Sequence, residues 1–426
     1  SQLPQGESAA IATFMQQSPI NYKSYFIIVV MFLESFNNLI SPLSLCKFLQ
    51  DYWEHSHLYL SREDSSFYSS LFSLEELHLL LWSVKPDWGK VQLARNSEGE
   101  PRFNISQTPP YINNISRAFN EGNTVIFNNV HLHSRNIALL TRSVEASLGF
   151  VTNANLYLTP PNAQGLSLHY DTHDVFILQV EGKKHWKIYE PWVKLPLDTM
   201  AETLPDTYEG EQIQELTLSP GDMLYLPRGM VHMAEATEET SLHLTLGVMV
   251  YTWKNFLESV LDIASKKENG LYLRKSLPVA VTWSDGSYEV SEQLESIVQK
   301  LVAGLHTNEA LKNLTQSLLD IMEPIPEIDH SFRDFTTEEV NLQTSVKKST
   351  GTLCKVFEDD NNITLYCTSG SGFSGPKEIK QALLFIAAQD DCFLTRDIPG
   401  NLTDKAKIIL VKRLLKENIL VLGYSL

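Results

Sequence analysis

Short apolar runs follow one another between Asn155 and Val250 with little but turn residues between them. Glu181-Gly182 and Pro220-Gly221 are two of these turns. A parallel sheet needs a crossover of a dozen or more residues between its strands, usually a helix. This region has no room for crossover helices. The pattern therefore predicts an antiparallel double-stranded β-helix of the jelly-roll kind.

Helical patterns stand on both sides of this strand series, so the fold class is mixed α and β. On the N-terminal side, apolar spacing predicts helices at residues 42–53 and 73–82 and short alternating strands across residues 91–127. After Tyr251, apolar residues recur at helical spacing as far as Ile321. Pro324-Ile325-Pro326 ends this all-helical segment.

The last part of the chain has a helix, helix, strand pattern at residues 376–388, 403–417 and 419–422, which is typical of a winged helix. We therefore predict three domains: a barrel domain with an N-terminal extension at residues 1–250, a helical domain at residues 251–330 and a winged-helix domain at residues 331–426. The apolar stripes of the helical domain exceed what one packed face needs, so we expect them to form a homodimer interface.

Composition limits the partners and the compartment. The chain has 34 Lys and Arg residues against 51 Asp and Glu residues, a formal net charge of -17. Such a molecule repels a phosphate backbone, so we expect a basic protein partner and no direct nucleic-acid binding, although acidity also simply aids solubility. The apolar run at residues 25–32 is shorter than the roughly 20 residues that span a bilayer. We interpret it as a buried strand, or as an extension before a natural start at Met31.

The four cysteines form no CxxC pair, which fits a reducing compartment. Without a basic nuclear-targeting run we favour bacterial cytoplasm, or the nucleolus or nucleus if the chain is eukaryotic.

The stretch LSLHYDTHDVF places His169 and Asp171 two residues apart at the end of a predicted strand. Side chains at i and i+2 of a strand project to the same face, so the two can share one metal ion. Downstream, a strand, turn, strand unit delivers His232. Two histidines and a carboxylate form the facial triad of non-haem Fe(II) oxygenases. His173 is the main competing ligand, and an ordinary polar or core role remains open for the other histidines, His131, His133, His173, His185 and His243.

A cosubstrate with two carboxylates needs a cation deep in the barrel, and Lys184 in VEGKKHWKIYEP is well placed for that role. Lys183 and Lys187 fit solvated strand positions better. A buried lysine without an anion is costly, so an inward Lys184 predicts an anion site. Asn155 and Tyr157 face the same way by the period of two and either donate hydrogen bonds there or are plain strand residues.

The stretches NLYLTPPNAQGLSLHYDTHDVFILQVEGKKHWKIYEP and LSPGDMLYLPRGMVHMA resemble the JmjC-type ribosomal oxygenases, a cupin group that hydroxylates side chains of ribosomal proteins. The resemblance covers most of the chain, including its helical and winged-helix parts in order. It implies Fe(II) on His169, Asp171 and His232, 2-oxoglutarate on Lys184 with contacts from Asn155 and Tyr157, and dioxygen as the oxidant.

The strings GKKHW and PRGMVH resemble the histidyl hydroxylases of the family more than the bacterial arginyl hydroxylases, so histidine is the favoured target and arginine the alternative. Two departures stand out: His57 replaces a usual proline, and Thr172 and His173 replace commoner acidic or amide residues, which we expect to alter the substrate mouth. Two other functions remain open, a JmjC histone or protein demethylase and a non-catalytic cupin scaffold with a nucleic-acid-binding winged helix.

Overall fold

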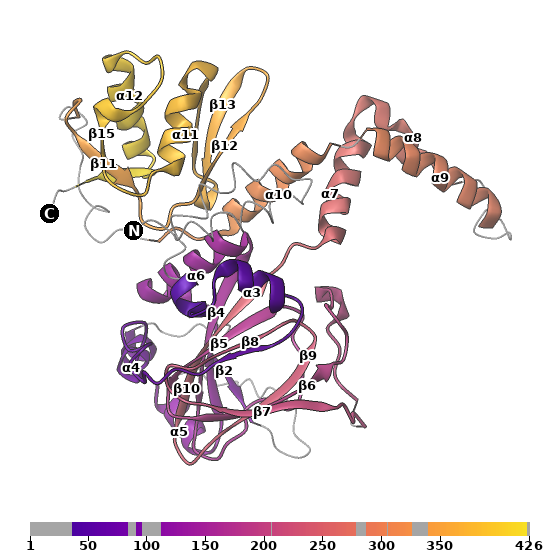
Figure 1. Cartoon of the computed structure of the whole chain (residues 1–426), viewed down its shortest axis with the longest axis vertical. Coiled ribbons are helices and arrows are strands. Elements are labelled where there is room, and N and C mark those ends of the chain that lie inside the picture. Colours follow the sequence, from indigo (N-terminus) through magenta and orange to yellow (C-terminus); the bar gives the residue numbers. More distant parts are fainter. Residues whose placement is uncertain are drawn as a thin grey trace. The chain divides into compact units, whose positions relative to one another are not determined.

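The computed structural model describes residues 36–83, 91–95, 112–205, 207–277, 287–304, 306–325 and 340–423. These residues form two compact units (Figure 1): the barrel unit, residues 36–250 with residue 325, and the C-terminal unit, residues 251–324 with 340–423. The strand expected at residues 25–32 lies outside the described residues. Within the described ranges, no helix is both long and apolar enough to cross a membrane.

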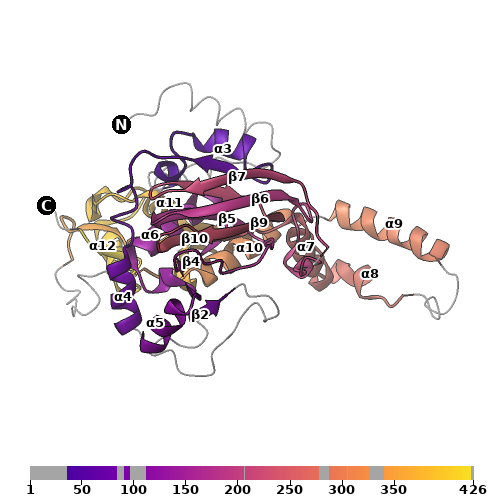
Figure 2. The ribbon, with the colours of Figure 1, turned by 90° about the horizontal axis from the view of Figure 1, so that it is seen from below.

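Two antiparallel sheets build the barrel unit, and β6, β7 and β9 of the smaller one lie side by side in Figure 2. The larger sheet has the strand order β1-β8-β5-β10-β4-β3-β2, and the smaller has the order β7-β6-β9. The antiparallel barrel expected from the sequence is therefore confirmed. The strands are β1 (Leu58–Leu60), β2 (Val91–Ala94), β3 (Thr124–Phe127), β4 (Val151–Thr159), β5 (Asp174–Glu181), β6 (Lys184–Pro191), β7 (Gln212–Leu218), β8 (Met223–Leu226), β9 (Met230–Ala236) and β10 (Ser241–Met249).

Strand β5 explains why part of the series reads as a continuous apolar run. Successive side chains of a strand point to opposite faces. Val175 and Ile177 pack toward the smaller sheet with Trp186 and Ile188, whereas Phe176 and Leu178 belong to the core under the helices. Both faces of β5 are thus buried, so alternation between apolar and polar residues is not required.

Helices cover the outer face of the larger sheet, where Phe36, Phe48 and Phe176 pack together. The expected helices at 42–53 and 73–82 are present, whereas the expectation of strands across 91–127 is wrong in its middle, because residues 112–120 form a helix. Ile115 and Phe119, four residues apart, turn to the core from one side of that short helix. The helices are α3 (Leu45–Asp51), α4 (Leu74–Ser83), α5 (Ile112–Asn120) and α6 (Arg135–Leu148).

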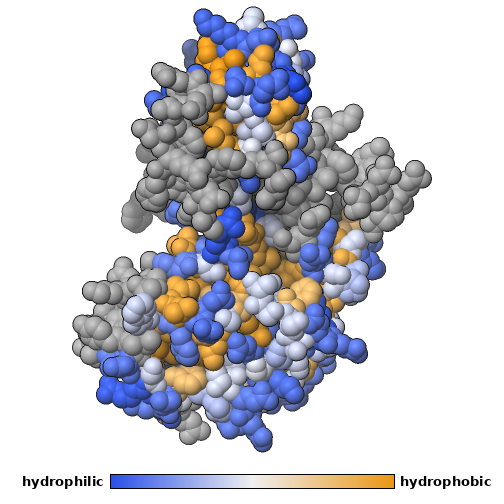
Figure 3. Space-filling view, turned by 90° about the vertical axis from the view of Figure 1, so that its left-hand side faces the viewer, coloured by the Kyte–Doolittle hydropathy of each residue, from blue (hydrophilic) through white to orange (hydrophobic). Residues whose placement is uncertain are grey.

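The outer surface of the barrel unit is mixed in character. Figure 3 shows hydrophobic patches scattered among hydrophilic residues on one face. Leu79 and Trp82 of α4 are among the exposed apolar side chains of this unit.

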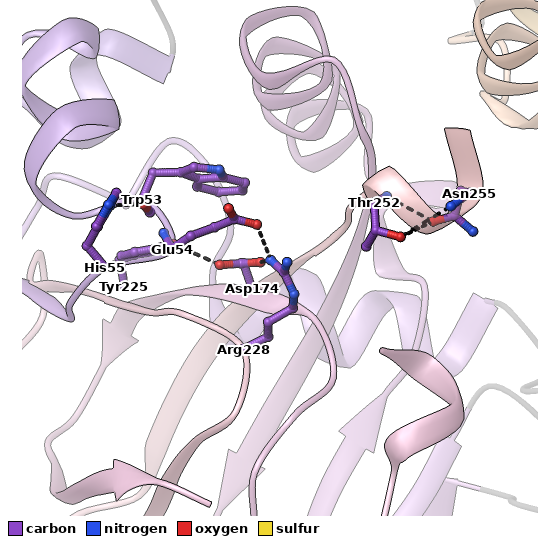
Figure 4. A network of polar contacts seen from close by, with 8 residues as sticks. All are labelled: Trp53, Glu54, His55, Asp174, Tyr225, Arg228, Thr252 and Asn255. Carbon is purple, nitrogen blue, oxygen red and sulfur yellow. Dashed lines mark hydrogen bonds and ion pairs between the residues drawn. The ribbon is translucent and has the colours of Figure 1, made fainter. Parts of the chain in front are cut away.

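The C-terminal unit begins with the helices expected from the sequence and continues with two small sheets, ordered β15-β11-β16 and β12-β13-β14. Thr252 and Asn255 cap the first helix reciprocally, backbone N–H to side-chain oxygen in each direction (Figure 4). Its elements are α7 (Trp253–Lys266), α8 (Leu271–Arg274), α9 (Ser287–Ala303), α10 (Thr307–Ile321), β11 (Ser345–Lys348), β12 (Cys354–Glu358), β13 (Asn362–Cys367), β14 (Gly372–Pro376), α11 (Lys380–Ala388), β15 (Phe393–Leu394), α12 (Asp404–Lys416) and β16 (Leu420–Leu422).

One expected boundary in this unit is wrong. Residue 376 ends strand β14, and the helix begins only at Lys380. The assignment of this part as a winged helix, its boundary with the helical domain and the dimerisation role of the helices stay predictions.

A buried ion-pair network joins the N-terminal segment to two strands of the barrel (Figure 4). Arg228 Nη1 lies 2.9 Å from Asp174 Oδ2 and 2.6 Å from Glu54 Oε1. The hydroxyl of Tyr225 donates to Asp174 Oδ1 at 2.8 Å and accepts from the Glu54 backbone N–H at 3.1 Å. Glu54 has a positive φ of 60°, a conformation that non-glycine residues adopt at a cost. The network therefore holds a strained residue in place.

We predict that Arg228→Ala lowers the free energy of unfolding by about 3–5 kcal/mol, because it leaves a buried charge without its partner. The Asp174 side chain is fully buried, and burial raises the pKa of this carboxyl despite the attraction of Arg228. Urea unfolding followed by circular dichroism measures the change. Glu54→Gln is the matched control: Glu54 is 34% exposed, so its removal should cost about 1 kcal/mol or less. Equal losses in the two variants would contradict the prediction.

Candidate metal centre

The backbones of His169 and His232 form an antiparallel bridge between the segment before β5 and strand β9. His169 N–H donates to His232 O at 3.1 Å, and His232 N–H donates to His169 O at 2.8 Å. Residues that face each other in this way carry their side chains on the same face. The two imidazole rings consequently lie with centroids 4.4 Å apart.

The carboxylate of Asp171 completes a cluster. One ligand atom each from His169, Asp171 and His232 can be chosen so that all three lie within 4.8 Å of one another. Asp171 O accepts from the Gly229 backbone N–H at 2.8 Å, which holds the segment to the turn before β9. Gly229 has φ +89°, and a Cβ there would meet Val193 O at 1.9 Å, so this tight turn requires glycine.

The segment 165–170 is not the regular strand that the sequence suggested. Its pairing with β9 consists of an isolated bridge between His169 and His232. A second isolated bridge joins Gln164, the residue before this segment, to Glu235. The expected i, i+2 relation of His169 and Asp171 nevertheless brings both side chains to the same place, because the bridge fixes the first and the turn at Gly229 fixes the second.

Both histidines present the same ring nitrogen to the cluster. His169 Nδ1 lies 2.7 Å from Ser167 O, and His232 Nδ1 lies 3.0 Å from Met230 O. A backbone carbonyl only accepts, so each Nδ1 carries the proton and donates it, which leaves the Nε2 lone pair available. Orientation of a ligating histidine by a second hydrogen bond of this kind is common in metal sites.

Burial and neighbouring charges lower the pKa values of Asp171 and His232, which favours the deprotonated forms that bind a divalent metal. Burial opposes ionisation of Asp171, but His169, His173 and His232 around it lower the pKa of this carboxyl overall. Burial, reinforced by the neighbouring His169, lowers the pKa of His232 to about 4. A deprotonated carboxylate and neutral imidazoles are the metal-binding forms of these groups. The donor set therefore fits a divalent transition metal such as Fe(II).

The cluster opens into a cavity of about 520 Å³ between the two sheets. Lys184 also lines it, is 4% exposed and donates from Nζ to Thr159 Oγ1 at 2.9 Å. Burial lowers the pKa of Lys184 to about 7. The expectation that Lys184 points inward agrees with this placement. Lys183 is exposed, and Lys187 is partly exposed on the opposite face of β6.

Asn155 and Tyr157 line the same cavity. Asn155 Oδ1 accepts from the Asn129 backbone N–H at 2.9 Å, and the Asn155 side chain also hydrogen-bonds the Tyr157 phenol. The Tyr157 ring stacks on His243 with centroids 4.7 Å apart and planes 3° from parallel. Burial, together with the charge of Asp171, raises the pKa of the Tyr157 phenol, which keeps its proton and can donate it.

The sequence did not reveal the roles of two residues that lie beside Lys184 and Tyr157. Thr159 accepts from Lys184, and His243 is 3% exposed with no hydrogen-bond partner for its Nδ1 among the described residues. The signal was the period of two: Thr159 follows Tyr157 by two residues. His243 faces Tyr157 across the β10–β4 pair.

The other histidines lie in different surroundings. His131 Nδ1 accepts from the Ala154 backbone N–H at 3.2 Å, and the His133 ring packs on Phe127. His185 is on the outer face of β6 and bonds Glu215 Oε1 at 2.8 Å. His173 lines the cavity but is not one of the three groups that converge within 4.8 Å.

Known proteins with similar sequences identify the domain in which this cluster lies. Residues 130–256 match the model of the JmjC domain. The bifunctional lysine-specific demethylase and histidyl-hydroxylase NO66 of Drosophila erecta is 31% identical over 69% of this chain and 46% of its own length. Ribosomal oxygenase 2 of Bos taurus is 29% identical over 65% of this chain and 61% of its own length. The chain spans about half the length of several curated relatives that it matches.

Solved structures support the fold. The ribosomal oxygenase YcfD of Escherichia coli, solved in complex with cobalt and 2-oxoglutarate, matches with a TM-score of 0.56 over 90% of this chain and 99% of its own. The sequence identity is 16%, so the likeness concerns the fold alone. The jelly-roll barrel and the resemblance to JmjC ribosomal oxygenases are thus confirmed.

Partly buried His131 and buried His243, both outside the metal cluster, lead us to predict that the free energy of unfolding falls in mild acid. Burial lowers the pKa of His131 to about 4, and burial together with Lys184 lowers the pKa of His243 well below its ordinary value. Between about pH 6.5 and 4, the unfolded chain binds protons that the folded chain does not. The free energy of unfolding should therefore decrease as pH falls through this window, by about 1.4 kcal/mol per pH unit for each proton.

Urea unfolding at pH 7, 6 and 5 with a metal chelator present measures this slope. In the control variant His131→Asn, an amide oxygen can accept the Ala154 N–H without titrating, so the slope should become shallower. A free energy of unfolding that stays constant from pH 7 to 5 would contradict the prediction.

Proposed function

Because the chain carries a JmjC domain related to those of the ribosomal oxygenases, we propose that it is an Fe(II)- and 2-oxoglutarate-dependent oxygenase that hydroxylates a histidine side chain of a ribosomal protein. The observation that carries this proposal is one cavity with two matched sites. His169, Asp171 and His232 converge at one of them, and buried Lys184 lies at the other.

In this proposal the metal is held by Nε2 of His169 and His232 and by the carboxylate of Asp171. Three ligands on one face leave positions open for a cosubstrate and dioxygen. When bound, Fe(II) supplies the activation of dioxygen that is coupled to decarboxylation of 2-oxoglutarate. The backbone carbonyls of Ser167 and Met230 keep both imidazoles in the required tautomer. The apolar walls, among them Val175 and Ile177, exclude water.

Lys184 is the proposed anchor for the remote carboxylate of 2-oxoglutarate. Within the described residues, Thr159 Oγ1 is the hydrogen-bond partner of its Nζ, whereas an ammonium has three donors. On the neighbouring strand β9, Ala236 faces Lys184 and His232 faces Ile188. Lys184 therefore lies four residues along β6 from the level of the metal ligand His232, a Cα separation of about 13 Å. An extended lysine side chain and a five-carbon diacid together bridge such a separation. Asn155 and Tyr157, on β4, can donate to the diacid between these two points.

The polar lining of the cavity favours a neutral target over a cationic one. Amide side chains line it at Gln92, Asn128, Asn129 and Asn153. Among the described lining residues Asp171 is the sole carboxylate, and the proposed metal occupies it. A guanidinium would thus be buried without a counter-charge, which is costly, whereas a neutral imidazole is not. Histidine is therefore the better substrate than arginine.

We predict that the metal-loaded enzyme, given 2-oxoglutarate, adds one oxygen atom to a histidine of a ribosomal protein. Acid-extracted total ribosomal protein is the substrate mixture, and peptide mass spectrometry locates the product. His232→Ala, which removes one proposed ligand, is the inactive control: it should lose Mn(II) binding by calorimetry while its circular dichroism spectrum remains that of the natural chain. Oxidation of arginine selects the alternative target. Loss of a methyl group from methyl-lysine would instead show a demethylase. No mass change in any ribosomal protein would favour the non-catalytic cupin scaffold.

We predict that Lys184→Ala selectively weakens 2-oxoglutarate binding by about tenfold or more, since a hydrogen bond to a charged group contributes roughly 1.5–3 kcal/mol. Mn(II) affinity should be retained, because Lys184 is not a proposed ligand. Titration calorimetry on the Mn(II)-loaded protein measures both affinities. Lys183→Ala, at an exposed neighbouring position, is the matched control and should bind 2-oxoglutarate like the natural chain. Unchanged affinity in Lys184→Ala would remove the residue from the site.

A homodimer is the second part of the proposal. Trp253, Leu257 and Leu261 of α7 are 75%, 52% and 41% exposed at a spacing of four residues. On α9, Leu294, Val298 and Val302 repeat the same spacing at 55%, 46% and 60% exposure. Apolar stripes of this size normally mark an interface. A second copy of the chain presents the same stripes and is the partner that fits them.

We predict a dimeric mass at micromolar concentration by light scattering. Val298→Glu should shift the mass toward the monomer, because it places a charge in the apolar stripe. Ser296→Glu, a matched change on the opposite side of α9, should leave the dimer intact. A monomeric mass for the unmodified chain would overturn the proposed interface.

A further inference from the structure

Strand β10 runs along the wall of the cavity from one end to the other. Four of its residues, alternating along the strand, line the cavity: His243, Thr245, Gly247 and Met249. His243 belongs to the Lys184 end, because it stacks on Tyr157 and the charge of Lys184 affects its pKa. Gly247 is four residues further along, about 13 Å away. The end at Gly247 is therefore opposite the proposed anchor of 2-oxoglutarate.

The His173 ring lies directly over Gly247. A Cβ added to Gly247 would come within 2.7 Å of His173 Cδ2 and 2.9 Å of its Nε2, and real Cβ atoms do not approach that closely. Gly247 is paired with Val175 of β5 and with Asn153 of β4, so its position is fixed by both neighbouring strands. Glycine at this point thus provides the space in which the imidazole sits.

The ring nitrogens of His173 are available to a ligand. His173 lines the cavity, and in the described part of the chain the structure shows no hydrogen bond to its ring. It stands beside the metal cluster without joining it, since the three convergent groups are His169, Asp171 and His232. A neutral imidazole offers one donor and one acceptor, which suits a polar target group entering from this end.

We propose that His173, seated on Gly247, contacts the substrate and determines specificity by hydrogen-bonding the polar end of the target side chain. The inference rests on the proposed function, because the anion end and the metal leave this end for the substrate. The chemistry required of the target is a neutral group that accepts or donates a hydrogen bond, as an imidazole does. No covalent bond to His173 forms or breaks in the reaction.

The first test compares His173→Phe with His173→Gln. Phenylalanine keeps a ring over Gly247 but loses the donor and the acceptor, whereas glutamine keeps both in an amide. Hydroxylation of acid-extracted total ribosomal protein, counted by mass spectrometry, should fall about threefold to tenfold in His173→Phe, the factor that one neutral hydrogen bond contributes. His173→Gln should retain more of it. His185→Phe, the same change on the outer face of β6, is the control and should match the natural chain.

The second test uses Gly247→Ala, which displaces the His173 ring without changing it and should lower hydroxylation in the same way. Calorimetry with Mn(II) and with 2-oxoglutarate supplies readouts independent of turnover, and both affinities should be retained in every variant at positions 173 and 247. Unaltered hydroxylation in His173→Phe overturns the proposal. Loss of Mn(II) binding in His173→Phe also overturns it, because the ring would then be a metal ligand. If the natural chain binds Mn(II) and 2-oxoglutarate but hydroxylates no ribosomal protein, the proposed function fails and this inference fails with it.

Discussion

Two backbone hydrogen bonds between His169 and His232 set the geometry on which the rest of the site depends. In an antiparallel bridge the two side chains emerge on the same face. The backbone pairing alone therefore brings the two imidazoles together. The turn at Gly229 then fixes Asp171 through a third backbone bond. The carbonyls of Ser167 and Met230 also orient the rings, so backbone contacts hold all three groups of the donor set. A preformed site of this kind loses little conformational entropy when it binds its ion.

The buried ion pair reinforces the same two segments from outside the cavity. Asp174 follows Asp171 by three residues, and Arg228 precedes His232 by four. Their contact at 2.9 Å therefore ties together the two segments that carry the cluster. Glu54 brings the N-terminal segment to the same guanidinium (Figure 4). A buried ion pair is weak evidence of net stability, but this one links the two segments beside the β5–β8 pair, where Val175 faces Leu226.

The sequence predicts those parts of the site that depend on local periodicity. The period of two placed Asn155 and Tyr157 in one cavity. The need of a dicarboxylate for a cation deep in the barrel pointed to Lys184, which lines the same cavity. It did not identify the bridge at His169, because pairing between distant segments is a tertiary property that no local pattern records. The α5 helix was missed although Ile112, Ile115 and Phe119 recur at helical spacing, because its nine residues are shorter than the window in which this period is recognised. Gly247 was missed because its importance lies in the His173 ring that covers it, and that contact joins separate segments of the chain.

Burial gives the two ends of the cavity opposite requirements. At one end, burial lowers the pKa of Lys184 to about 7, so near neutral pH an anion that binds there also draws a proton to the amine. The low dielectric that makes the unpaired ammonium costly strengthens its contact with a carboxylate. At the other end, the Asn153 amide and the His173 imidazole stand beside Gly247 and line the wall, and both offer hydrogen bonds to a polar side chain. In the function that we propose, the buried amine therefore takes the anionic cosubstrate, and the opposite end of the cavity is left for a neutral target.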